Sequence, residues 1–141
     1  MTADDLVVGI VGGMGPAATV DLLRRIIALT PASDDADHLR ILVDNNPRVP
    51  SRIAALLDGD GVSPAPAIAA MARGLVDAGA EVLAMPCNTA HYYYDEIAAQ
   101  VDVPFINLIE VVAEALSRDY PRARRLGLLG STAIQSIDLY G

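Results

Sequence analysis

Lysine is absent from the 141-residue chain, and all ten basic residues are arginine. Without a lysine the chain cannot form a Schiff base, which excludes pyridoxal phosphate chemistry. The same absence excludes a phosphate-binding P-loop, because that motif needs a Gly-Lys pair. Eighteen acidic residues give a net charge of −8 and a pI near 4.5. Such a charge repels phosphate, so we expect no nucleic acid and no membrane among the partners.

Cysteine occurs once, as Cys87, so the chain cannot close an internal disulfide, which suits a reducing cytosol. The two histidines, His38 and His91, do not combine with Cys87 in any metal-ligand spacing, and we expect no metal site. No uncharged apolar run reaches the roughly 18 residues of a membrane span. The N-terminus also lacks the basic start of a secretory signal. These features predict a soluble, cytoplasmic protein.

Hydrophobic residues make up 52% of the chain, enough to bury the core of one domain. Short apolar runs predict strands at 6–11, 39–43, 81–85, 103–106 and 126–129. Helical spacing of apolar residues predicts helices at 17–29, 66–78, 89–100 and 109–119, with a short helical piece at 53–57. Strands that alternate with crossover helices indicate an α/β fold with a parallel sheet and helices on both faces.

The turn after the first strand is rich in glycine, from Gly12 to Pro16. Its backbone amides and the start of the next helix could approach an anion. Read from Gly13, the turn also fits the looser dinucleotide pattern G-x-G-x-x-A, with Asp44 placed to hold a ribose. Two interpretations stay open here: a nucleotide-binding module, or a tight turn without a ligand.

Cys87 directly follows a buried strand and precedes a helix, a position where unsatisfied backbone amides favour the thiolate. The alternative is an inert thiol in the core. His91 lies four residues later, on roughly the same helix face. It could orient the thiol or a substrate carboxylate, and a structural histidine that caps a neighbouring loop is an equal alternative.

Arg52 ends the loop after the second strand, and its planar guanidinium suits a carboxylate. An acidic chain needs such a local positive group to hold an anionic substrate. Arg48 competes for this role, and either arginine alone could be a solvated surface charge. The three tyrosines at 92–94 predict packing on the helix surface or a contact in a homodimer.

Three stretches of the sequence together are similar to one known family. The runs GIVGGMGPAATVDLLRRI, NNPRVPSR and above all MPCNTAH resemble the aspartate/glutamate racemases, especially the aspartate racemases. The resemblance extends from Leu6 to about Leu129. It implies a flavodoxin-like fold, in which this chain forms one domain of a pseudo-symmetric two-domain protein. It also implies an active site between the domains, an amino-acid substrate of anionic character, and no cofactor.

The resemblance implies a role for each matching residue. Racemisation removes the α-proton on one face of the substrate and returns one on the other, and the family places a cysteine on each side. Cys87 corresponds to the first of these cysteines. Arg52 corresponds to the arginine that takes a substrate carboxylate, and Asn88 and Thr89 to residues that hold the substrate. Met14 and Gly15 correspond to the turn that lines the same cleft.

The sequence departs from the family pattern in its last part. Nothing corresponds to the Gly-Cys-Thr-Glu turn that supplies the second cysteine. Ala133 and Ile134 stand where a Gly-Thr pair is usual, and Ser51 stands where aspartate is common. We therefore expect residues 1–120 to form a first α/β domain that carries Cys87, and residues 121–141 to be the truncated beginning of a second.

The sequence thus predicts a cofactor-independent isomerase, an aspartate or glutamate racemase with one half of its cysteine pair. Three alternatives remain: the nucleotide-binding module, an inactive truncated remnant, and a one-cysteine decarboxylase of the arylmalonate type. The sequence leaves open whether the substrate is aspartate or glutamate.

Overall fold

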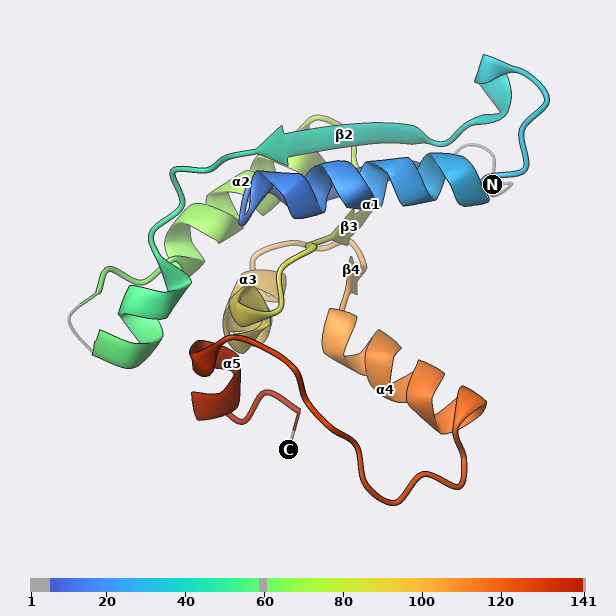
Figure 1. Ribbon diagram of the computed structural model, residues 1–141. Helices are drawn as coiled ribbons and strands as arrows, with labels where there is room; N and C mark the ends of the chain where they lie inside the picture. Colours follow the sequence, from blue (N-terminus) through green and yellow to red (C-terminus); the bar gives the residue numbers. More distant parts are fainter. Residues whose placement is uncertain (1–5, 59–60, 141) are drawn as a thin grey trace.

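A four-stranded parallel sheet forms the centre of the protein in the computed structural model, which describes residues 6–58 and 61–140 (Figure 1). The strands are β1 (Val7–Gly12), β2 (Arg40–Asn45), β3 (Val82–Ala84) and β4 (Phe105–Ile106). Their order is β2-β1-β3-β4, with every neighbouring pair parallel. The expected α/β fold with a flavodoxin-like parallel sheet is confirmed, and four of the five expected strands are present.

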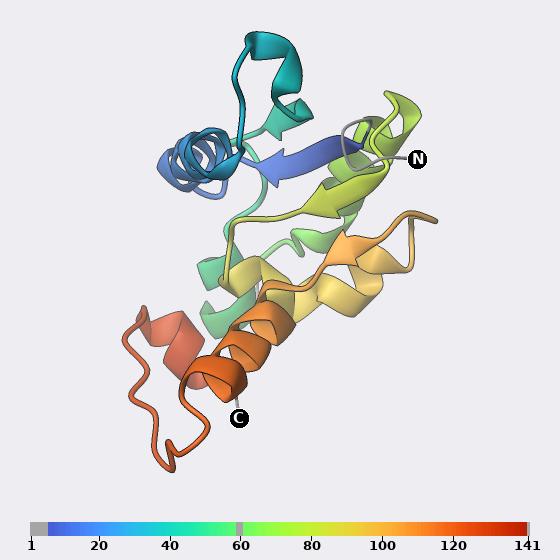
Figure 2. The same cartoon turned by 90° about the vertical axis from the view of Figure 1, so that its right-hand side faces the viewer.

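Helices cover the sheet on both faces (Figure 2). The α-helices are α1 (Pro16–Leu29), α2 (Ala65–Asp77), α3 (Tyr94–Ala98), α4 (Leu108–Asp119) and α5 (Thr132–Ser136). Short helical turns of other types are η2 (Asp35–Asp37), η3 (Ala54–Asp58) and η4 (Thr89–Tyr93). From β1 the chain runs to β2 at one edge of the sheet. It then crosses past β1 to β3 and continues to β4 at the other edge. Right-handed crossovers in opposite directions place α1 on one face and α2 and α3 on the other.

The core lies between the sheet and α2. Val11, Ile68 and Leu83 are fully buried there, because α2 turns one apolar stripe toward β1 and β3. Gly79 follows the end of this helix with φ +102°, a left-handed conformation that suits glycine and ends the helix as expected. None of the helices in the described residues is long and apolar enough to cross a membrane.

The C-terminal part of the chain differs from the expectation. Residues 126–129 form no strand, so that prediction was wrong. A strand needs a neighbour to pair with, and this segment runs through solvent with Leu129 fully exposed. Beyond it, α5 returns toward η3 and buries Ala133 and Ile134 (Figure 1). The expected helix at 89–100 is also divided, into η4 and the shorter α3.

Candidate functional site

Three turns meet at the carboxyl end of the sheet, after β1, β2 and β3. One residue from each turn enters a common buried cluster: Met14, Val49 and Cys87. Strands β1 and β3 are neighbours from which the chain departs in opposite directions, and ligands of such sheets bind at this place. The fold therefore brings the turn of Met14, the loop that leads to Arg52, and the turn of Cys87 to one edge.

The glycine-rich turn is held in shape by its own neighbours. Gly13 has φ +93°, and a Cβ there would lie 2.4 Å from the backbone of Asn46. The Gly13 N–H donates to Oγ1 of Thr19 at 2.9 Å, and Thr19 is buried. Gly15, in contrast, is exposed, with open space where a side chain would stand. The turn thus packs against the β2 loop through Gly13 and leaves Gly15 facing outward.

The same turn bears on what cofactors the site could hold. A dinucleotide cradle uses the backbone amides of the glycine-rich turn, and the Gly13 amide is already bonded to Thr19. This removes a donor that the nucleotide-binding alternative needs. Within residues 6–58 and 61–140, no three His, Cys, Asp or Glu side chains gather closely enough to hold a metal ion.

Cys87 lies just below the surface, with 8% of its area exposed. Its Sγ is 3.5 Å from Oγ1 of Thr89, and its backbone N–H donates to the carbonyl of Met85. The thiol therefore has apolar neighbours from the core on one side and a hydroxyl group on the other. Asn88, next in the chain, is exposed.

Arg52 is half-buried and turned back onto its own loop. Its Nη1 donates to the carbonyls of Pro50 at 3.0 Å and Val49 at 3.3 Å. The Nε is buried and has no hydrogen-bond partner among the described residues, and none of their ion pairs includes Arg52. Arg48 is exposed instead. Of the two candidates, Arg52 is the arginine that holds an uncompensated, partly desolvated positive charge.

His91 is buried and uses both of its ring nitrogens. Its Nδ1 lies 2.7 Å from the carbonyl of Cys87, and the Leu108 N–H donates to its Nε2 at 3.1 Å. The ring stacks on Tyr94, and burial lowers the pKa of the imidazole. These contacts favour the structural interpretation of His91 that the sequence left open.

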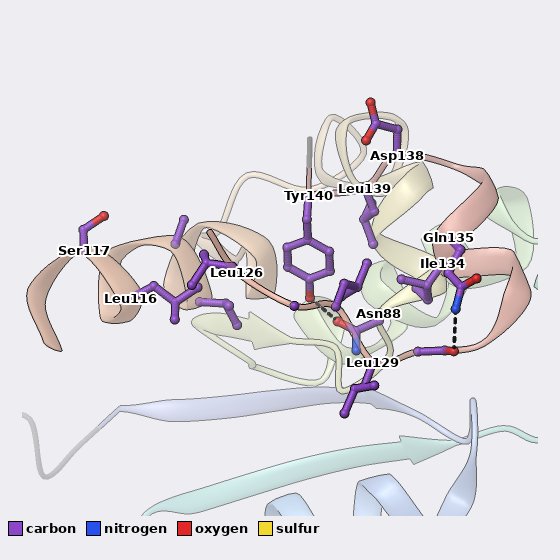
Figure 3. A pocket seen from close by; sticks show the side chains of 15 residues that line it. Asn88, Leu116, Ser117, Leu126, Leu129, Ile134, Gln135, Asp138, Leu139 and Tyr140 are labelled. Atoms are coloured by element: carbon purple, nitrogen blue, oxygen red, sulfur yellow. Dashed lines mark hydrogen bonds between the residues drawn. The ribbon is translucent and has the colours of Figure 1, made fainter. Parts of the chain in front are cut away.

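An apolar groove of about 670 Å³ opens beside Asn88, between α4, the segment 126–130 and α5 (Figure 3). Tyr140 lies across it and donates a 2.6 Å hydrogen bond to Oδ1 of Asn88. Cys87 and Arg52 do not line this groove. Sequence reasoning missed Tyr140, because no motif or spacing links a residue so far along the chain to the turn of Cys87.

Comparisons with known proteins find similar sequences and similar folds. A model of the family described as Asp/Glu/hydantoin racemase matches residues 11–141. A broad specificity amino-acid racemase of Bacillus subtilis is 32% identical over 124 residues, which cover 85% of this chain and 53% of the relative. The solved aspartate racemase of Picrophilus torridus is 34% identical with a TM-score of 0.86, over 96% of this chain and 56% of that one.

Two more distant structures share the fold. They are an aspartate racemase homologue from Pyrococcus horikoshii, with 21% identity and a TM-score of 0.64, and a putative Asp/Glu racemase from Yersinia pestis, with 22% and 0.66. They cover 82% and 81% of this chain. Each match takes in about half of the known protein, so this chain spans about half the length of its relatives.

Proposed function

The chain belongs to the Asp/Glu/hydantoin racemase family, and we propose that it forms one half of the active site of an amino-acid racemase in which Cys87 moves the α-proton. The substrate is aspartate or glutamate. The observation that carries the proposal is the shared edge of Cys87 and Arg52. The Cys87 thiol lies beside the Thr89 hydroxyl, and the half-buried guanidinium of Arg52 has no acidic partner among the residues that the structure describes. The turns that carry the two groups pack in one cluster.

Each residue of the edge has a part in the chemistry. The Cys87 thiolate removes the α-proton, and Arg52 holds the α-carboxylate through the part of its planar guanidinium that the carbonyls of its own loop leave free. Thr89 hydrogen-bonds the sulfur, and Asn88, exposed beside it, contacts the substrate. The turn of Met14 and Gly15 lines the same cleft: Met14 packs in the cluster with Cys87, and Gly15 leaves room for a ligand. Positive charge at the carboxylate stabilises the carbanion that proton removal creates.

One cysteine serves only one face of the α-carbon. Racemisation needs a second acid on the opposite face, and this chain contains no second cysteine. We infer that residues 1–120 form the first α/β domain and that residues 121–141 are the beginning of a second, which carries the other half-site. The exposed leucines of the segment 126–129 lie outside the core cluster of the first 120 residues, which supports this division.

The reaction proposed needs no cofactor. The chain has no lysine for a Schiff base, and thiol acid–base chemistry by itself transfers the proton. The nucleotide-binding alternative has less support, because Thr19 occupies the Gly13 amide.

Proton exchange in heavy water tests the proposal on this chain. We expect it to replace the α-proton of L-aspartate or L-glutamate by deuterium roughly 100-fold faster than a Cys87→Ala variant, as followed by proton NMR. Deuterium should enter on the face that the proton left, so exchange should outpace inversion measured by chiral chromatography. Equal exchange by the chain and by Cys87→Ala would mean that Cys87 does not act as a base in this chain.

Arg52→Lys supplies a second arm of the same experiment. Lysine keeps the charge but loses the planar fork, so we expect the KM for the amino acid to rise about tenfold. The matched control is Arg48→Lys, which changes an exposed arginine on the same loop. If both variants behave alike, Arg52 does not hold the carboxylate.

A further inference from the structure

His91 connects two segments that end at the candidate site. Only 5% of its surface is exposed. Its Nδ1 is 2.7 Å from the carbonyl oxygen of Cys87, in the turn after β3. Its Nε2 is 3.1 Å from the backbone nitrogen of Leu108, in the first turn of α4. The imidazole is therefore a bridge between the main chain of Cys87 and the start of α4.

The two partners determine where the proton of the imidazole lies. A carbonyl oxygen only accepts hydrogen bonds, so Nδ1 must carry the proton that bonds Cys87. The backbone N–H of Leu108 only donates, so Nε2 must be bare. Both bonds are made only by the neutral ring with its proton on Nδ1. In that state the ring has neither a proton nor a lone pair left for a substrate.

Aromatic packing holds the ring in this orientation. Tyr94 stacks on His91 with centroids 5.8 Å apart and planes inclined by 6°. The Tyr94 hydroxyl in turn donates a hydrogen bond to the carbonyl of Phe105, in β4. His91 and Tyr94 are thus hydrogen-bonded to the backbone of α4 and of β4, respectively. This matters because α4 itself has no buried residue to fix its position.

We propose that His91 is a positioning residue for Cys87: it fixes the carbonyl of Cys87 against α4, and it carries no proton to or from the substrate. This inference rests on the proposed function, in which Cys87 is the base. The two hydrogen bonds on which the inference depends are made to main-chain groups, the carbonyl of Cys87 and the N–H of Leu108. The proton transfers of the reaction belong to Cys87 and the group on the opposite face.

Two substitutions separate the two bonds. In His91→Asn the side-chain amide nitrogen replaces Nδ1 and can bond Cys87, but the side chain is too short for Leu108. In His91→Gln the amide oxygen reaches toward Leu108, and the bond to Cys87 is lost. Each variant keeps one half of the bridge and serves as the matched control for the other.

The readouts are amide hydrogen exchange at Leu108, by NMR, and α-proton exchange of the substrate. We expect His91→Asn to speed amide exchange at Leu108 by roughly tenfold, the effect of one lost hydrogen bond. His91→Gln should preserve that protection and lower kcat for α-proton exchange at least tenfold, with a smaller change in KM. His91→Asn should lower kcat by a smaller factor than His91→Gln.

Three results would overturn the inference. One is an equal loss of kcat in both variants, as general destabilisation would produce. Another is a ¹⁵N spectrum of the unmodified chain with the proton on Nε2 at neutral pH, which needs no variant to fold. The third is unchanged protection of Leu108 in His91→Asn. Failure of the proposed function itself would be seen separately, as equal α-proton exchange in Cys87→Ala.

Discussion

The hydroxyl of Tyr140 donates a 2.6 Å hydrogen bond to the side-chain oxygen of Asn88, although 52 residues separate the two in the sequence. The bond links the end of the described chain to the turn that holds Cys87. It occupies Oδ1 of Asn88 and leaves the Nδ2 group as a donor. A donor beside the thiol suits a substrate carboxylate. Under the proposed function we therefore expect Tyr140 to orient Asn88 for binding.

Removal of the Tyr140 hydroxyl tests this relationship. In Tyr140→Phe the amide of Asn88 is free to rotate, and we expect the KM for the amino acid to rise between roughly twofold and tenfold, with kcat nearly unchanged. Steady-state α-proton exchange in heavy water measures both constants. Tyr120→Phe is the control, since Tyr120 is 64% exposed in the same part of the chain. A KM equal to that of the unmodified chain would contradict the role of Tyr140.

The contact between Gly13 and Asn46 leads to a prediction about stability. Alanine at position 13 would need a left-handed backbone and would place a Cβ 2.4 Å from the Asn46 carbonyl carbon. We expect Gly13→Ala to lower the free energy of unfolding by more than about 2 kcal/mol, as measured by urea denaturation.

The control for that substitution is another glycine. Gly74 lies within α2, with open space where its side chain would stand. Gly74→Ala should raise the free energy of unfolding by about 0.5–1 kcal/mol, because alanine favours the helix. If the two variants shifted stability in the same direction, the close packing of Gly13 would not be what holds this turn.

Most of the fold could be predicted because its signals are local. The apolar run at 6–11 and the helical spacing after Pro16 encode β1 and α1 within a few residues, and Gly79 marks the end of α2. The segment 126–129 shows the limit of such signals. Its apolar composition indicates a strand, but a strand forms only where another strand offers hydrogen-bond partners, and composition does not supply the partner.

The candidate site also has a part that could be predicted from the sequence and a part that could not. Cys87 and Arg52 could be picked out because each follows a strand, and parallel strands end at one edge. The hydrogen bonds of His91 to Leu108 and of Tyr140 to Asn88 join segments that are remote in sequence. The spacing of residues along the sequence therefore does not indicate them. The role of His91 remained open between two interpretations until the positions of both bonding partners were known.

The state of His91 makes stability depend on pH. Burial lowers the pKa of this imidazole below the ordinary value of 6.5, and the backbone groups of Cys87 and Ile106 offset only part of the shift. Above pH 7 neither the folded nor the unfolded chain protonates it. As the pH falls below about 6.5, His91 binds a proton in the unfolded chain but not in the folded chain. The free energy of unfolding therefore decreases from that point down to the lowered pKa.

Urea denaturation between pH 8 and pH 5 measures this decrease, which a single histidine limits to about 1.4 kcal/mol per pH unit. The carboxyl groups of Asp21 and Asp37, whose pKa values are lowered from 3.8, lose their contribution only at more acid pH. We expect the decrease to be smaller in His91→Asn, which has no titrating ring at this position. His38→Gln, measured in parallel, shows how much of the decrease comes from the other histidine. A decrease of the same size in His91→Asn would show that a different group takes up the proton.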